Sequence, residues 1–236
     1  MDAVAIQTKI NSGYAKAASY VGKTYSHYRP TAGQPPIGSA TLIGVIIAAF
    51  TVKGVGFNFD KPGGAKDFYW NCLADGSLLQ PGDVLVSSAQ TFAIAAMQPL
   101  LPPIAVLSND RIAVSRQISE IAGAGGSASA PPSQVGGSIP YFGDRNKQTG
   151  GEAAIVANVP CAIAALGARA LDSKDGLPSS SPGPVRWKFL IAAGVVPQGT
   201  INDRDVITDQ LGSRYVVSQN YWGPLGYEVE AVREEA

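Results

Sequence analysis

His27 is the first side chain to consider for catalysis, because a Ser–His or Cys–His nucleophile would need the only histidine among the 236 residues. It precedes Arg29 and a run of prolines, with no carboxylate nearby in the sequence. A histidine at the surface or in an interface is therefore the favoured interpretation. The two cysteines, Cys72 and Cys161, lack the spacing of a zinc site or a redox pair and predict two buried thiols.

Motifs for metals and nucleotides are equally weak. Asp203, Asp205 and Asp209 could hold a divalent cation, but between short strands aspartates more often cap turns. Residues 123–128 imitate a dinucleotide-binding fingerprint, which requires a helix that the prolines at 131–132 prevent. No Gly-x-x-x-x-Gly-Lys-Ser/Thr loop occurs. We therefore expect no catalytic residue, no metal, no cofactor and no enzymatic activity.

The composition limits the classes of partner. Lys and Arg together number 18, as do Asp and Glu, so the formal net charge is zero, which argues against wrapping nucleic acid or lying on anionic lipid. Charged residues make up only 15%, as expected where much of the surface faces other protein. The start of the chain does not resemble a signal peptide, and the apolar run 40–52 is too short to span a bilayer. These features predict a soluble protein made in the cytoplasm.

Residues 2–25 form the one segment with helical periodicity, and Asp2 can cap it. The following segment 29–36 is rich in proline and predicts a tether, so we expect the helix to dock on a partner. Deletion of residues 1–30 should then leave the thermal stability of the free subunit unchanged. The first 30 residues carry a side-chain charge of +3 and residues 228–236 one of −3, which suggests that one subunit's helix meets its neighbour's tail. The candidate interface residues are Ile6, Ile10, Tyr14, Val21, Lys9, Lys16, Glu234 and Glu235.

The rest of the chain predicts strands. Short apolar or alternating runs are separated by Gly, Pro, Asn and Asp, as in small β-barrels or sandwiches. The predicted fold is mainly β, with an N-terminal helix and two small β modules. The expected divisions are a helix and arm (1–38), a first β module (39–118), a linker or loop rich in Gly, Ala, Ser and Pro (119–150) and a second β module (151–236).

The two halves also resemble each other. Each contains an Asp-led strand, an aromatic-led strand and a closing apolar strand, which suggests two related barrels in tandem, although a β-rich chain can produce such matches by chance. The matched positions are Asp83 and Asp205, Phe92 and Tyr215, Val106 and Val229, Trp70 and Trp187, and Arg116 and Arg233.

Segments Leu78–Gln117 and Ile201–Val232 resemble neck proteins of tailed bacteriophages, the head–tail connector, stopper or collar proteins. Asp205-Val206-Ile207, Gly212 and Tyr215-Val216-Val217 match their strand pattern best. The resemblance covers about half of the chain. It implies a virion protein, assembled in the host cytoplasm, that forms a ring of six or twelve subunits between the portal or adaptor and the tail proteins, with DNA passing through the lumen.

Two alternatives remain open. One is a tail terminator or tail-tube protein, which would differ in ring order and partner. The other is a ligand-binding β-sandwich, in which aromatic side chains would line a cleft. The candidate aromatic residues are Trp70, Trp187, Tyr221 and Trp222.

Overall fold

The computed structural model describes residues 2–31, 33–52, 66–117, 152–167 and 185–234. It contains one α-helix, a single 3₁₀ turn and two closed six-stranded β-barrels, which confirms the predicted fold class. The first barrel is preceded by α1 (Ala3–Val21) and consists of β1 (Lys23–Tyr28), β2 (Leu42–Thr51), β3 (Tyr69–Leu73), β4 (Val84–Val86), β5 (Thr91–Ala96) and β6 (Ile104–Ser108). The second consists of β7 (Asp110–Gln117), β8 (Glu152–Gly167), β9 (Arg186–Ala192), β10 (Val206–Thr208), β11 (Arg214–Gly223) and β12 (Gly226–Arg233).

Helix α1 ends four residues earlier than expected. Its N-cap is Asp2, whose carboxylate accepts a hydrogen bond from the Val4 N–H at 3.4 Å. At its other end Gly22 lies against the backbone of β2, where a Cβ would approach the Ala48 carbonyl oxygen to 2.8 Å. Strand β1 follows directly and pairs with β2 and β4. The expected arm 1–38 is therefore wrong, because it contains a barrel strand and the proline-rich segment follows this strand instead of the helix.

The boundary between the modules also differs from the expectation. Strand β7 was expected within the first module, 39–118, but it pairs with β8 and β10 of the second barrel. Only Asn109 separates it from β6, and the Asn109 side chain bonds both the N–H and the C=O of Ile163, at 2.8 and 2.9 Å. Because the two strands follow each other with a single residue between them, their sequence does not reveal the change of barrel. The expected linker 119–150 lies outside the described residues.

The two barrels are structural repeats. Their strand orders, β1-β2-β3-β6-β5-β4 and β7-β8-β9-β12-β11-β10, are the same cyclic order. Trp70 packs edge-on against Phe92 at 5.8 Å between ring centroids, and Trp187 packs in the same way against Tyr215 at 5.6 Å. The matches between the Asp, aromatic and Trp positions are thus confirmed in space.

The registers correct the two remaining matches. In the first barrel Val106 pairs with Ala93. In the second barrel the equivalent pair is Val232 and Val216, so the counterpart of Val106 is Val232 and not Val229. Arg116 lies on β7, the strand equivalent to β1, and is therefore not the partner of Arg233 in the repeat.

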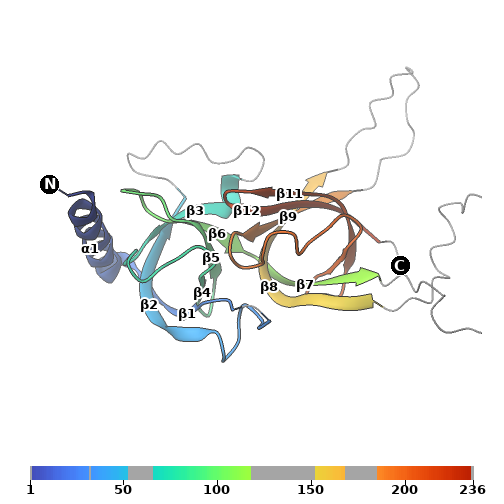
Figure 1. Ribbon diagram of the computed structural model, residues 1–236, viewed down its shortest axis with the longest axis horizontal. Helices are drawn as coiled ribbons and strands as arrows, with labels where there is room; N and C mark the ends of the chain where they lie inside the picture. The colour runs from blue at the N-terminus through green and yellow to red at the C-terminus, as the bar shows by residue number, and fades with distance from the viewer. Residues whose placement is uncertain (1, 32, 53–65, 118–151, 168–184, 235–236) are drawn as a thin grey trace, which may run out of the picture.

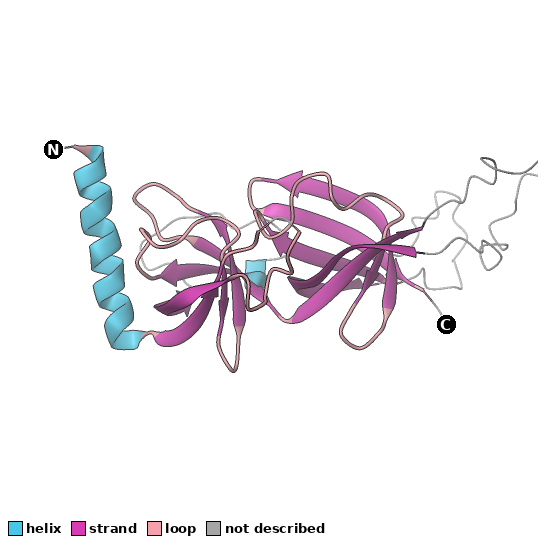
Figure 2. Cartoon of the chain, turned by 60° about the horizontal axis from the view of Figure 1, so that its bottom comes forward, coloured by secondary structure: helices cyan, strands magenta, loops and turns pink. Residues whose placement is uncertain are grey.

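One buried hydrophobic cluster spans both barrels, and a second, which includes Tyr25, Leu85 and Phe92, belongs to the first barrel alone. Val84 and Ile104 of the first barrel belong to the same buried cluster as Phe189 and Ile207 of the second. The molecule is elongated, with α1 at one end, the first barrel in the middle and the second barrel towards the C-terminus (Figures 1 and 2). Shared burial makes the two barrels one structural unit.

Candidate functional site

Two buried aspartates, one in each barrel, are clamped by arginines in the same geometry. Asp83 accepts bonds from Arg29 Nε and Nη2, both at 2.8 Å. Asp205 accepts bonds from Arg116 Nε at 2.7 Å and Nη2 at 2.8 Å. Such bidentate, charge-assisted pairs fix the orientation of both side chains. Sequence reasoning identified the aspartates as turn residues but missed their arginine partners, which lie 54 and 89 residues away.

The same backbone turn presents each aspartate. The Gln80 N–H donates to Asp83 Oδ2 at 2.9 Å, and the Asn202 N–H donates to Asp205 Oδ2 at 2.8 Å. The residue before each aspartate has a positive φ, +94° at position 82 and +72° at Arg204. A glycine at 82 also permits close approach of the second barrel, since a Cβ there would lie 2.6 Å from the carbonyl carbon of residue 194.

His27 belongs to the first clamp, which corrects the expectation of a surface or interface histidine. It is 5% exposed, and its Nε2 lies 2.8 Å from Asp83 Oδ2. Register places His27 opposite Leu85 and Val114 opposite Ile207, so the second barrel has a valine where the first has this histidine. Burial raises the pKa of Asp83, but bonds from Arg29, His27 and a backbone N–H outweigh it, and the pKa lies below its usual value.

The apolar stripe of α1 lies partly against its own barrel. Ile6, Ile10 and Tyr14 are half-buried, and α1 packs on β2 and β3. The Leu100 N–H donates to the Gln7 side chain at 2.8 Å, joining the helix to the β5–β6 loop. This contact corrects the idea that the helix favours a partner over packing at home.

The charged candidates are divided between the two ends of the molecule. Lys9 and Lys16 are exposed on α1, whereas Glu234 follows β12 and bonds Arg214 at 2.9 Å in its own barrel. Glu235 lies outside the described residues. The structure does not bring these lysines and Glu234 together, and Figure 1 shows α1 and the C-terminus at opposite ends.

The outer face of β2 is apolar and exposed. Strand alternation turns Ile46 and Ala48 into the core and leaves Ile43, Val45 and Ile47 outside, at 52%, 68% and 47% exposure. Val21 at the end of α1 is also exposed, at 70%. Neighbouring exposed β-branched residues of this kind mark a surface suited to protein contacts.

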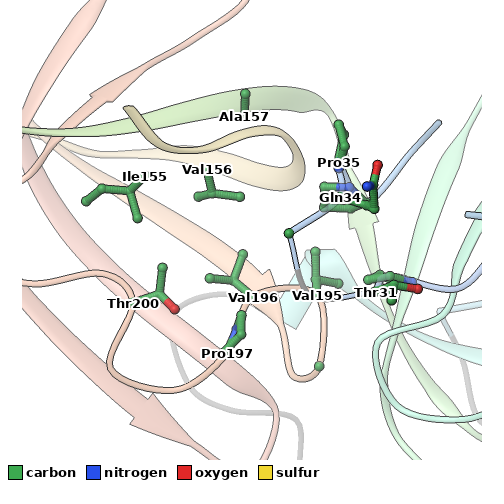
Figure 3. A pocket seen from close by; sticks show the side chains of 14 residues that line it. Thr31, Gln34, Pro35, Ile155, Val156, Ala157, Val195, Val196, Pro197 and Thr200 are labelled. Carbon is green, nitrogen blue, oxygen red and sulfur yellow. The ribbon is translucent and has the colours of Figure 1, made fainter. Parts of the chain in front are cut away.

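A hollow of about 420 Å³ lies between the barrels. Figure 3 shows Ile155, Val156 and Ala157 of β8 on one side and the segment from Val195 to Pro197, after β9, on another. Thr31 and Pro35 line it from the loop after β1. None of its lining residues is ionisable, so the hollow offers no acid, base or metal ligand.

The three aspartates proposed above as alternatives for metal binding have separate partners. Asp205 bonds Arg116, Asp203 accepts from the Asn220 N–H at 3.1 Å, and Asp209 accepts from the N–H groups of its own hairpin loop. Their oxygens are occupied by hydrogen bonds that stabilise turns. In the described part of the chain, no group of three His, Cys, Asp or Glu side chains could hold a metal ion.

The four aromatic candidates do not converge on one cleft. Trp70 and Trp187 belong to the ring pairs of their own barrels, and Trp222 packs edge-on against Tyr227 at 4.6 Å. Tyr221 alone is substantially exposed, at 60%.

Comparison with known proteins finds no matching family, no matching curated protein and no matching solved structure. Within the described ranges, no helix is both long and apolar enough to cross a membrane.

Proposed function

We propose that this protein is a structural component of a tailed-phage neck, which forms a homo-oligomeric ring between the head and the tail. The observation that carries the proposal is the uncovered apolar face of β2, at the helical end of an elongated molecule. Because Ile43, Val45 and Ile47 are already about half buried, covering them with another subunit contributes about 1 kcal/mol for each side chain.

The two barrels support this role mechanically. A buried cluster spans both barrels, and they contact each other through the backbones of Gly82 and Gly194, which favours a strut of fixed shape over two hinged domains. The Arg–Asp clamps hold the strand ends of each barrel in a defined orientation. A ring that joins two larger assemblies requires subunits of this rigidity, and low surface charge suits its protein contacts.

The β2 face and α1 are proposed as one assembly surface. Val45, Ile47 and Val21 supply the apolar part, while Lys9 and Lys16, which are exposed on α1, add positive charge. Glu234 shares Arg214 with Glu152, so this group of three side chains keeps a net negative charge that a neighbouring subunit's lysines could meet.

Mixing the protein with portal and tail components tests this role. We expect light scattering and electron microscopy to show a ring, whose order separates a neck position from a tail-terminator position. Val45→Glu places a charge on the β2 face at a site 68% exposed and should prevent assembly without lowering thermal stability. Leu211→Glu is the matched control, because Leu211 is 90% exposed on a hairpin of the second barrel. A wild-type protein that stays monomeric with every component, or a Val45→Glu variant that assembles normally, contradicts the proposal.

A further inference from the structure

Each barrel has a hollow at the same place in the repeat. In the first barrel a hollow of about 380 Å³ is lined by residues 43–45 of β2 and by Leu78. The hollow of about 420 Å³ between the barrels is lined by residues 155–157 of β8 and by Thr200. Leu78 and Thr200 correspond to each other, since the carbonyl oxygen of each accepts a hydrogen bond from the clamp arginine of its barrel at 3.0 Å.

The strand segments that line the two hollows also correspond. Gly44 of β2 and Val156 of β8 lie opposite equivalent positions of β1 and β7. In both strands the pairing skips the preceding residue, Ile43 in one and Ile155 in the other, so even this bulge is repeated. The two hollows are therefore one feature that occurs twice.

In the second barrel, other parts of the chain cover this feature. The connection between β1 and β2 lines the hollow with Thr31, Gln34 and Pro35 (Figure 3), and its Ile37 carbonyl accepts a hydrogen bond from Asn158 Nδ2 at 2.8 Å. Strands β5 and β6 of the first barrel pack beside it on β8 and β9. The hollow of the second barrel thus lies between its own strands and a proline-bearing connection of the preceding barrel.

In the first barrel, only part of this covering has a counterpart. Helix α1 packs on β2 and β3, as β5 and β6 pack on the equivalent strands β8 and β9, so it occupies the place where another barrel would pack. No described segment takes the place of the β1–β2 connection, and Ile43, Val45 and Leu78 are 52%, 68% and 55% exposed. The repeat therefore predicts that an extended segment, and not a further barrel, covers this hollow.

We propose that the hollow of the first barrel receives residues 118–151 of a neighbouring subunit, the connection between β7 and β8. The inference rests on the subunit contact proposed above and names the segment that makes it. This connection is the equivalent, in the second barrel, of the β1–β2 connection that covers the other hollow. Both connections contain a Pro-Pro pair, at 35–36 and at 131–132.

Length and direction agree with an occupant from the next subunit. Figure 1 shows β7 ending near the C-terminus, at the end of the molecule opposite α1, whereas the hollow belongs to the first barrel. In a head-to-tail contact between subunits, this end meets the first barrel of the next copy. A connection of 34 residues that is anchored at both ends reaches about 55 Å at most, which is enough to cross such a contact.

The chemistry of the hollow also agrees with this segment. Residues 121–143 contain no charged side chain, as suits a hollow in which Arg29 is already paired with Asp83. Arg29 donates three of its five N–H groups to Asp83 and to the Leu78 carbonyl. Its Nη1 group remains to donate to a main-chain carbonyl of a docked segment, while Ile43 and Val45 contact the prolines.

Disulfide trapping between two variants tests the proposal. Leu78→Cys places a thiol at the hollow, and Ser133→Cys places one directly after the Pro-Pro pair. The natural thiols of Cys72 and Cys161 are buried and do not compete. After mild oxidation, an equimolar mixture of the two variants, one carrying a mass tag, should give a mixed dimer on non-reducing electrophoresis. Leu100→Cys is the matched control, because Leu100 is a loop leucine of similar exposure, 48%, outside the hollow, and should give no mixed dimer.

A peptide separates this contact from ring formation. A fluorescent peptide of residues 128–141 should bind the wild type with a dissociation constant of about 10 μM to 1 mM, measured by anisotropy. Replacing both prolines of its Pro-Pro pair with serine should weaken binding at least tenfold. Leu78→Glu should abolish binding, whereas Leu100→Glu should not affect it.

Three results would overturn the proposal. These are a mixed dimer no more abundant with Leu78→Cys than with Leu100→Cys, equal peptide affinity in Leu78→Glu and the wild type, and a Leu78→Cys/Ser133→Cys double variant that closes only within single chains. Rings that form without trapping refute this contact and leave the neck role standing. Trapping and peptide binding in a protein that no phage component recruits support this contact and refute the neck role.

Discussion

Removing the arginine from each clamp should destabilise the two barrels unequally, because only the first clamp contains a histidine. In Arg116→Ala, the buried carboxylate of Asp205 keeps one described donor, the Asn202 N–H at 2.8 Å. In Arg29→Ala, Asp83 keeps two, a backbone N–H at 2.9 Å and His27 Nε2 at 2.8 Å. Arginine removal thus leaves the Asp205 carboxylate with fewer hydrogen-bond donors than the Asp83 carboxylate.

The magnitude follows from burial and from the donors that remain. Leaving a buried charge without its partner costs about 3–5 kcal/mol, and the 44% exposure of the Arg116 side chain places this clamp near 3, since water reaches the vacated position. A hydrogen bond to a charged group contributes about 1.5–3 kcal/mol. With His27 retained, Arg29→Ala should therefore cost about 1–2 kcal/mol, roughly 1.5 less than Arg116→Ala.

Urea unfolding of the wild type and both variants measures this difference. Trp70 in the first barrel and Trp187 in the second report on each repeat, and the buried cluster that spans both barrels predicts one transition. His27→Val gives the first clamp the residue that the second has at this position, so it should raise the cost of Arg29→Ala to that of Arg116→Ala. Equal losses in the two single variants, or no effect of His27→Val on the Arg29→Ala loss, would refute the reasoning.

The remaining predictions concern pH, the N-terminal helix and the strained turn. The pKa of Asp83 is lower in the folded than in the unfolded protein, so its contribution to stability is present above pH ~4 and is lost as the pH falls through the folded pKa. In Asp83→Asn, the free energy of unfolding measured from pH 7 to pH 2 should therefore fall less steeply than in the wild type. Deleting residues 1–21 should leave both barrels closed with a reduced melting temperature, whereas deleting 1–30 also removes β1 and should unfold the first barrel, as circular dichroism would record. Arg204→Gly should stabilise by about 0.5–1 kcal/mol by relieving a positive φ, while Gly82→Ala should destabilise, both measured by urea unfolding.

Each of these has a control or a contradicting result. Asp67→Asn, at an exposed aspartate without an ion pair among the described residues, should retain the full acid loss. A 1–30 deletion as stable as the wild type would restore the expectation of a separable arm and contradict the pairing of β1. A loss of stability in Arg204→Gly would mean that the Arg204 side chain contributes more than its backbone costs.

Local patterns in the sequence predicted the strands well. The β-branched apolar run 40–52 predicted the strand β2, although as a buried strand, whereas its outer face is exposed; Asp83 and Asp205 lead β4 and β10 as the turn chemistry indicates. The helix was predicted because its periodicity and its Asp2 cap are both encoded within a few residues. Gly22, a glycine that can end a helix, is the C-cap of α1, but its close approach to the β2 backbone is not encoded in a local pattern.

The candidate site depends on contacts between residues that are far apart in the sequence. The contact between one subunit's helix and its neighbour's acidic tail was inferred from net charge and stays a prediction, whereas the bond of Glu234 to Arg214 arises because strand pairing brings the start of β11 beside the end of β12. His27 was expected at the surface because no carboxylate is near it in sequence, yet barrel closure places β4 beside β1 and Asp83 against its ring.

The sequence by itself determined the class of fold, the strands and the repeat of Asp, aromatic and Trp positions, since side-chain alternation and turn residues act over neighbouring positions. Tertiary structure alone decided where one barrel ends, which arginine clamps which aspartate and that Leu78 and Thr200 line equivalent hollows. Those features arise from strand register and barrel closure, which join residues more than 50 positions apart through backbone pairing that is not specific to residue type.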